Sequence, residues 1–324
     1  MAPRRITPGQ VWFVTRRTTR RHFLLRPDAD GTCQNIYWYT TAVLSKKFGI
    51  LVHAVQVMSN HIHEVLTDTR GELPNFIRER NRALANALKC HRRWPEEVFQ
   101  RAPANCVELH GAAAVLRQIG YTLANCVEAG LVNSPTEWPG PTVLPEEIGT
   151  RTIIATRPSV YFDPENEVWP EQAELHIAMP EDLVTEHGSR AAAEIRTAVQ
   201  AAVVLARNAL RAAGKAIKSA YEAVALPFEK RAKSFETFGK RYPTFAAGGV
   251  AHLAKRALAM RREFRTAYAH ALRAWRAGHR DVPFPRGTWR WHRELGAPAP
   301  QIFQCRSDLQ ATCKEGWWRR PRGD

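Results

Sequence analysis

The sequence predicts an α+β domain followed by a mostly helical, strongly basic region. In the first 140 residues, short segments rich in β-branched and aromatic residues alternate with segments of helical periodicity. After residue 186, amphipathic helical spacing dominates. Because an acidic, proline-rich stretch separates the two, we divide the 324-residue chain into a domain over 1–140, a connector over 141–186 and a basic helical domain over 187–324.

The N-terminal elements follow from local patterns, in chain order. Alternating or β-branched segments predict strands over 11–15, 53–58 and 61–66. Helical periodicity ending near Gly49 and Gly130 predicts helices over 35–48, 73–90 and 112–129. Ser59 and Asn60 are turn residues between the second and third strands, so these strands form a hairpin. Short strands, a central hairpin and flanking helices fit a small α+β sandwich.

The charge distribution indicates a polyanionic partner. The formal net charge is +16 and the pI is about 10.1. Residues 141–186 contain ten acidic residues and two arginines, whereas residues 190–280 contain 19 Lys or Arg and five Glu. Nucleic acid and an anionic membrane surface are the two partners that such a surplus attracts.

The remaining composition favours a cytoplasmic protein that binds nucleic acid. No apolar run approaches the roughly 20 residues that span a bilayer, and the first residues lack the apolar stretch of a signal peptide. Six cysteines form no C-x-x-C pair, which argues against a zinc ribbon or a disulfide framework. We therefore expect reduced thiols and no membrane association.

Two histidines flank Ile62 on the third predicted strand. His61 and His63 follow Met58-Ser59-Asn60 directly. Because strand side chains alternate, both imidazoles project from one face and Ile62 projects from the other. Two imidazoles in this position can chelate one divalent metal. The spacing alone also fits two surface or core histidines.

The helix predicted over 112–129 has a polar stripe beside its apolar one. Its apolar stripe comprises Leu116, Ile119, Leu123 and Val127. Arg117, Tyr121 and Asn125 lie four residues apart on another face. Such a tyrosine could simply place its hydroxyl in water. Together with a phosphate-neutralising metal it could also attack a phosphodiester, and the phosphotyrosine bond would keep the energy needed for rejoining.

These residues resemble the motifs of the single-tyrosine HUH transposases, which include the REP-associated tyrosine transposases. Residues 57–63 (VMSNHIH) resemble the M-x-N-H-x-H strand of that family. Residues 121–132 (YTLANCVEAGLV) resemble its Y-x-x-x-N-P-V-x-A-G-L-V helix, and Trp138-Pro139-Gly140 matches the W-P-G that often follows. The resemblance covers roughly residues 1–145, and two motifs in order are more specific than either alone.

The resemblance implies a ferredoxin-like HUH domain, an antiparallel sheet with helices on one side and the histidine strand at its centre. It implies that His61, His63 and Asn125 bind Mg²⁺ or Mn²⁺ and that Tyr121 cleaves single-stranded DNA through a 5′-phosphotyrosine. The implied activity is that of a metal-dependent transposase or endonuclease acting at hairpin-flanked sites. Family members are usually homodimers, and we expect the protein to associate with the nucleoid in the cytoplasm.

Three positions depart from the family pattern without removing a catalytic group. Cys126 replaces the usual proline, Glu128 stands where a basic residue is common, and Glu64 stands where an apolar residue is common. Glu64 shares a strand face with Ile62, so it points away from the metal side. We expect it to pair with a cation or to lie near the edge of the sheet.

Basic and aromatic residues provide candidate DNA contacts. The basic candidates include Arg16, Arg17, Arg20 and Arg21, which could grip phosphates beside the active site. The others are Arg117, Arg207, Arg211 and Lys215. For any one of them a solvated surface is the alternative, but the summed charge of the basic helices favours DNA contact. The aromatic candidates for base stacking, which could instead pack in a core, are Trp289, Trp291, Trp317 and Trp318. Residues 284–288 (FPRGT) resemble the closing F-P-x-G-T of longer family members.

Other interpretations remain open from the sequence. The protein could be a domesticated relative that nicks hairpins without moving itself. It could also be a non-catalytic DNA-binding or regulatory protein with a vestigial site, although the four intact site residues argue against that. A replication initiator or relaxase shares the chemistry but fits the pattern after Tyr121 less well. The acidic 141–186 stretch could pack on the basic helices and mask them until DNA arrives.

Overall fold

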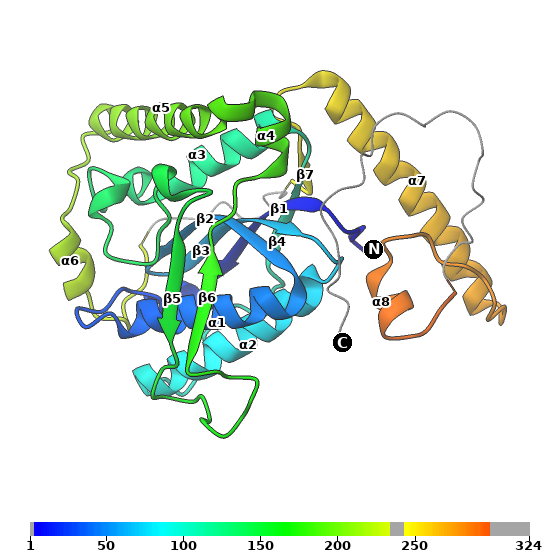
Figure 1. The fold of residues 1–324 in the computed structure, drawn as a ribbon, viewed down its shortest axis with the longest axis horizontal. Helices are drawn as coiled ribbons and strands as arrows, with labels where there is room; N and C mark the ends of the chain where they lie inside the picture. Colours follow the sequence, from blue (N-terminus) through cyan, green and yellow to red (C-terminus); the bar gives the residue numbers. More distant parts are fainter. Residues whose placement is uncertain (1–2, 234–242, 299–324) are drawn as a thin grey trace, which may run out of the picture.

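A five-stranded sheet in the order β2-β3-β1-β4-β7 forms the centre of the molecule (Figure 1). Its strands are β1 (Gln10–Arg17), β2 (Ile50–Met58), β3 (His61–Asp68), β4 (Asn105–Leu109) and β7 (Phe245–Ala246). Neighbouring strands pair antiparallel except β4 and β7, which pair parallel. The structure is a computed structural model and describes residues 3–233 and 243–298. Trp317 and Trp318 lie outside the described residues.

The predicted hairpin over 53–66 is confirmed as β2, a two-residue turn and β3. β3 pairs along its whole length with β1 on one side and with β2 on the other. All of β2 except Leu51 is buried, and so is most of β3. Strands buried on both faces need cover on both sides of the sheet.

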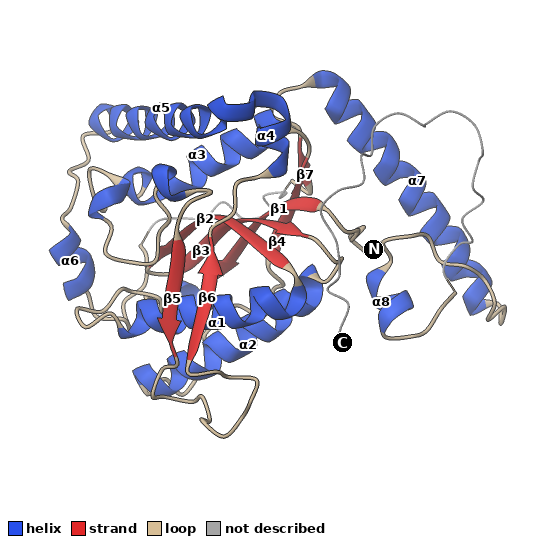
Figure 2. Ribbon diagram, in the orientation of Figure 1, coloured by secondary structure: helices blue, strands red, loops and turns tan. Residues whose placement is uncertain are grey.

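Helices accordingly cover both faces, which corrects the prediction of helices on one side (Figure 2). α1 (Thr32–Phe48) and α2 (Leu73–Arg92) lie on the face of β3 that carries Glu64, with which both helices interact. α3 (Ala112–Glu128) lies on the opposite face, next to His63. The alternation of a single strand predicts which residues share a face, but not that both faces are covered.

A buried ion pair fastens α2 to β3. Arg80 donates to both carboxylate oxygens of Glu64, with 2.8 Å between Nη2 and Oε2, and the hydroxyl of Tyr37 donates to Oε1 at 2.7 Å. The Arg80 and Glu64 side chains are 0% exposed. Burial and the adjacent carboxylate raise the pKa of Tyr37 well above its usual value, so it stays a donor. Glu64 thus pairs with a cation, one of the two expected alternatives.

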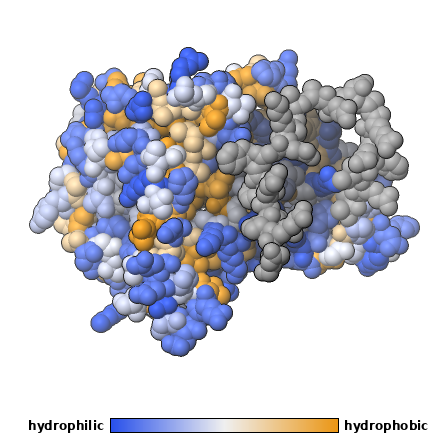
Figure 3. Space-filling view, in the orientation of Figure 1, coloured by the Kyte–Doolittle hydropathy of each residue, from blue (hydrophilic) through white to orange (hydrophobic). Residues whose placement is uncertain are grey.

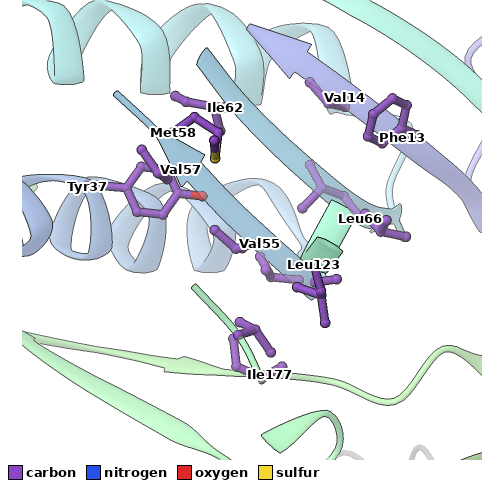
Figure 4. Packing of buried hydrophobic residues seen from close by; sticks show 14 of the residues in the cluster. Phe13, Val14, Tyr37, Val55, Val57, Met58, Ile62, Leu66, Leu123 and Ile177 are labelled. Carbon is purple, nitrogen blue, oxygen red and sulfur yellow. The ribbon is translucent and has the colours of Figure 1, made fainter. Parts of the chain in front are cut away.

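Residues 141–186 pack into the same core as the sheet. β5 (Thr152–Thr156) and β6 (Gln172–His176) form an antiparallel hairpin whose inner residues, such as Ile153 and Leu175, are buried. The hairpin packs against α1 and β2, and its outer residues, including Glu174, face solvent. The core therefore crosses both boundaries predicted from the sequence. Figure 4 shows Ile177 of this stretch next to apolar residues of the sheet. Two elements at its ends, η3 (Pro145–Glu147) and α4 (Glu181–His187), also contact α5 (Ala191–Ala212), so deleting the stretch would uncover the core as well as part of this basic helix.

α5 (Ala191–Ala212) packs along α3 on the side away from the sheet (Figure 1). A Cβ on Gly120 of α3 would lie 2.9 Å from the carbonyl oxygen of Ala198, so the glycine permits this close approach. Ile195, Val199 and Val203 of α5 are buried, as their spacing predicts. α3 is therefore held between the sheet and α5.

The C-terminal part of the described chain forms a helical arm. α7 (Ala251–Arg276) leaves the body next to β7, and a small second apolar cluster joins it to residues 282–297 (Figure 1). In that cluster the rings of Phe284 and Trp291 stack with centroids 4.1 Å apart. Trp289, at the start of α8 (Trp289–Arg293), packs against the main core. Trp289 and Trp291 therefore both pack against apolar side chains, which is the alternative to base stacking.

The remaining elements are short. They are α4 (Glu181–His187), α6 (Ala220–Ala225) and the 3-10 helices η1 (Thr19–Arg21), η2 (Pro135–Glu137), η3 (Pro145–Glu147) and η4 (Gly188–Arg190). The segment resembling F-P-x-G-T contacts the N-terminal segment, where the Ile6 amide donates to the Gly287 carbonyl at 2.9 Å. Among the described helices, none combines the length and apolar character needed to cross a bilayer.

Arg80→Ala is expected to reduce the free energy of unfolding by about 3–5 kcal/mol, because it leaves the Glu64 carboxylate buried without a counter-charge. Urea unfolding measures this loss. The control Arg82→Ala removes an exposed arginine of the same helix and should stay within about 0.5 kcal/mol of the wild type. Equal stability of the two variants would contradict the anchoring role of the pair.

His53 should make stability fall on acidification. It is 1% exposed, its Nδ1 lies 2.8 Å from the Ala178 carbonyl oxygen, and burial lowers its pKa to about 4. Between pH 6.5 and 4 the unfolded chain binds a proton there that the folded chain does not, so stability decreases as pH falls. His53→Gln should reduce that slope by up to about 1.4 kcal/mol per pH unit in urea unfolding. The control His176→Gln removes an exposed histidine of β6 and should change the slope less than His53→Gln does.

Candidate active site

His61 and His63 lie on the same face of β3, as the strand alternation predicts. Their ring centroids are 4.6 Å apart and the ring planes are nearly perpendicular, at 89°. His63 is 5% exposed and His61 is partly buried. Because β3 is paired on both sides, its backbone holds the two rings at this spacing.

Polar neighbours face the ring nitrogens of both histidines. His61 Nδ1 lies 2.6 Å from Asn60 Oδ1, and His63 Nδ1 lies 3.2 Å from the hydroxyl of Thr15. His61 Nε2 likewise faces an amide oxygen, Asn125 Oδ1, and a neutral imidazole can donate to only one of these two oxygens. Burial lowers the pKa of His61 to about 4 and that of His63 well below its usual value. Both rings are thus neutral at pH 7, the form that binds metals.

Asn125 brings an oxygen to the same place. Its Oδ1 lies 3.1 Å from His61 Nε2, and the side chain is 7% exposed. With the His61 proton on Nδ1, where it is donated to Asn60, the lone pairs of Nε2 and Asn125 Oδ1 face each other, which is unfavourable. The conflict is removed either when the amide turns so that its NH₂ donates to Nε2, or when both atoms bind one cation.

Tyr121 lies beside the histidines and is 40% exposed. Its ring is edge-on to His63, with centroids 5.4 Å apart, and edge-on to Phe13 at 5.9 Å. Phe13 in turn stacks on His63 at 5.4 Å with planes 7° apart. The tyrosine ring is therefore packed against Phe13 and His63 but keeps part of its surface exposed to solvent.

Opposing influences act on the Tyr121 phenol. Burial is the largest and raises its pKa above the usual 10, and the Glu128 carboxylate acts in the same direction. The positive charge of Arg17 and a hydrogen bond with Asn125 lower it in part. The phenol is thus protonated at neutral pH, and a cation next to it favours loss of the proton.

Cys126, which replaces the usual proline of the resembled motif, is buried, and α3 continues past it to Glu128.

The donor set of the site is small. Among the described residues, no group of three His, Cys, Asp or Glu side chains could hold a metal ion. The atoms available here are two imidazole nitrogens and one amide oxygen. An ion held by them would keep further coordination positions open for water or a phosphate oxygen.

The basic residues at the end of β1 and after it lie on different faces of the sheet. Arg17 and Arg21 lie near the histidines, where their positive charges help to lower the pKa of His61. Arg16 points to the opposite face of the sheet and donates to the carbonyls of Gln100, at 2.7 Å, and Ala102. This placement differs from the expectation that Arg16 lies beside the active site, because adjacent strand residues face opposite ways.

The other predicted contacts are spread over three elements. Arg20 is exposed in η1, and Arg117 is exposed one turn before Tyr121 on α3. Arg207 donates from Nε to the Asn133 carbonyl at 2.8 Å, so it ties the loop after α3 to α5. Arg211 and Lys215 are exposed at and after the end of α5.

Two features of the site were not predicted from the sequence. Phe13 and Thr15 contact the histidines from β1, and only the register between β1 and β3 shows this. The W-P-G motif supports the hairpin, since the Trp138 indole donates to the Val57 carbonyl at 2.9 Å. A Cβ on Gly140 would lie 2.5 Å from that indole nitrogen, which accounts for the glycine.

Comparison with known proteins gives structural neighbours only. No family model matches the chain, and no curated protein matches its sequence. One similar structure is that of a REP-associated tyrosine transposase bound to a REP hairpin, with 18% identity, a TM-score of 0.37 and coverage of 43% of this chain and 80% of the other. Another, from Deinococcus radiodurans, is named provisionally as a transposase, with 19% identity, a TM-score of 0.27 and coverage of 39% and 96%. At these low similarities neither neighbour determines the function.

The pKa of Tyr121 is expected to lie above 10, because burial and Glu128 both disfavour the phenolate. The difference in absorbance at alkaline pH between the wild type and Tyr121→Phe isolates this one tyrosine. Glu128→Gln should move its midpoint down, since a negative charge is removed. A midpoint at or below 10 in the wild type, or no movement in Glu128→Gln, would contradict this description of the site.

Proposed function

We propose that the protein is a metal-dependent, single-strand-specific DNA transposase or endonuclease in which Tyr121 is the nucleophile. The observation that carries this proposal is the meeting of Tyr121 and Asn125 on α3 with two neutral histidines on β3. These four side chains come from two segments about 60 residues apart that separately resemble one family of nucleases.

His61, His63 and Asn125 would hold the metal, Mg²⁺ or Mn²⁺. The 3.1 Å between His61 Nε2 and Asn125 Oδ1 suits neighbouring ligands of an octahedral ion, because ligand distances of about 2.1 Å put such neighbours about 3.0 Å apart. A shared cation would also relieve the opposed lone pairs. When bound, the ion would polarise the scissile phosphate and neutralise part of its charge.

In the proposed step, the Tyr121 oxygen forms a bond to the scissile phosphorus and the bond from phosphorus to the 3′-oxygen breaks. The 5′-phosphate stays on Tyr121, and the leaving strand ends in a 3′-hydroxyl that takes up a proton in exchange for the one the phenol releases. Attack by a second 3′-hydroxyl would reverse the step and restore the phenol. The phosphotyrosine bond conserves the energy of the broken phosphodiester, so rejoining requires no nucleoside triphosphate.

Residues around the nucleophile would support this step. The charge of Arg17 favours the phenolate that forms as Tyr121 attacks, and it also suits a phosphate oxygen at this position. Phe13 limits rotation of the His63 ring by stacking on it. The proposal also includes hairpin-containing DNA as the substrate and a homodimer as the assembly. Both are implied by the motif resemblance.

Tyr121→Phe should abolish covalent attachment of DNA, because it removes the oxygen that attacks phosphorus. Full-length protein is incubated with 3′-end-labelled single strands from the flanks of its own gene, with Mn²⁺ or with EDTA, and resolved on a denaturing protein gel. The wild type should carry label only with metal, and Tyr121→Phe and His61→Ala should carry at least about a hundredfold less, as removal of a nucleophile or an electrostatic partner predicts.

Tyr221→Phe is the matched control, because Tyr221 is 81% exposed on α6 and belongs to no part of the site. It should form the adduct as the wild type does. An adduct that survives in Tyr121→Phe would refute the assigned nucleophile. Tight DNA binding without an adduct on any flank would instead support a non-catalytic DNA-binding protein.

A further inference from the structure

We propose that the exposed basic face of α7 binds the backbone of double-stranded DNA. This surface is distinct from the site around Tyr121, and the inference shares with the proposed function only the class of polymer. It concerns five exposed residues, which we call the α7 stripe: Lys255, Arg262, Arg265, Arg273 and Arg276.

The α7 stripe occupies one side of a long helix. At 100° per residue its five members fall within a sector of about 80°, and at a rise of 1.5 Å they extend over about 32 Å. Glu263, the only acidic residue of α7, lies outside this sector. Within the described part of the chain, none of the five takes part in a salt bridge.

The opposite side of α7 holds the helix in place. Ala257, Phe264 and Ala271 are buried, and Tyr268 and Trp275 pack against the segment 282–297. The apolar face therefore explains how α7 is held against its neighbours. It does not explain why the other side of the helix carries the α7 stripe. Outside the grey residues, the surface at this end of the molecule is largely hydrophilic (Figure 3).

Like charges along the α7 stripe disfavour the helix in isolation. Arg262 and Arg265, and again Arg273 and Arg276, are three residues apart, where like charges repel. Arg265 also lowers the pKa of the neighbouring Arg261, after the larger effect of burial. A helix face that serves only solubility usually mixes both signs. A polyanion along the stripe would offset this repulsion.

The shape and chemistry of the α7 stripe favour a nucleic-acid duplex over an acidic protein. Its length of about 32 Å is close to the 34–36 Å of one DNA turn. Four of the five residues are arginines, whose planar groups bind phosphate in a bidentate manner. A protein interface would also need an apolar centre, and Leu258 is the only large apolar side chain exposed on α7.

The base of α7 is packed against the start of the tyrosine helix. A Cβ on Gly248 would lie 2.5 Å from the backbone of Ala113 and Ala114, and one on Gly111 would lie 2.7 Å from a Leu253 methyl group. Leu253 belongs to the first turn of α7, and α3 begins at Ala112. A duplex bound along α7 would therefore be held in a constant position relative to α3, on which Tyr121 lies.

The test compares two full-length variants with the same loss of charge. The first changes the α7 stripe to glutamine, which keeps helix propensity. The control changes five exposed basic residues elsewhere to glutamine: Lys46, Lys47, Arg190, Arg196 and Lys218. Binding of a blunt 20-base-pair duplex is measured by fluorescence anisotropy from 50 to 300 mM KCl, and circular dichroism checks helicity.

The stripe variant should bind the duplex at least tenfold more weakly at 100 mM KCl. Its slope of log affinity against log salt should be smaller by up to about 4.5, since each of five lost phosphate contacts removes about 0.9. The control should stay within about threefold of the wild type. Equal losses in both variants, or no loss in the stripe variant, would overturn the inference. Stronger competition by polyglutamate than by duplex at equal charge would assign the stripe to an acidic protein instead.

Cleavage is measured separately, so the two proposals can fail independently. The stripe variant should still form the Tyr121 adduct on a single strand that has no stem. An adduct without duplex binding by the wild type would overturn only the α7 inference. Loss of duplex binding in the stripe variant of a protein that forms no adduct would support α7 and refute the cleavage proposal.

Discussion

The double-sided pairing of β3 is the constraint on which the site depends. With β1 and β2 hydrogen-bonded along its length, β3 can neither slip nor rotate, so its alternation separates two kinds of chemistry. Glu64 faces α2 and forms a buried ion pair with Arg80, whereas His61 and His63 face α3 as neutral rings. A shift by one residue would bury the histidines against Arg80 and expose the carboxylate to the tyrosine.

α3 is constrained in a comparable way from two sides. The sheet packs on one side of it and α5 on the other, and Gly120 permits the close approach of α5 next to Tyr121 itself. Arg207 of α5 also serves this packing through its hydrogen bond to the loop after α3. The region that composition marks as a separate basic domain thus contributes directly to the position of the nucleophile.

The local elements could be predicted from the sequence, because each depends on a short pattern. Short motifs also singled out His61, His63, Tyr121 and Asn125, which lie together in the structure, while their roles stay a prediction. The three predicted strands, the hairpin and the three N-terminal helices occur where periodicity predicts them, whereas β4 and β7 were not predicted. The packing of residues 141–186 could not be predicted from composition. In β5 and β6 every second residue is buried, so acidic outer positions and apolar inner positions coexist in a segment that is acidic on average. The prolines of this segment suggested loops, but the segment also contains the β5–β6 hairpin.

The sequence by itself determined which side chains of β3 and α3 share a face, since that depends only on the periods of strand and helix. It also determined the charge surplus and the spacing of the α7 stripe. Only the tertiary structure decided which faces meet. The contacts of Phe13 and Thr15 with His63, the direction of Arg16 and the pairing of Glu64 with Arg80 all join residues distant in sequence. Such contacts depend on strand register and on cover of both faces of the sheet, which no local pattern contains.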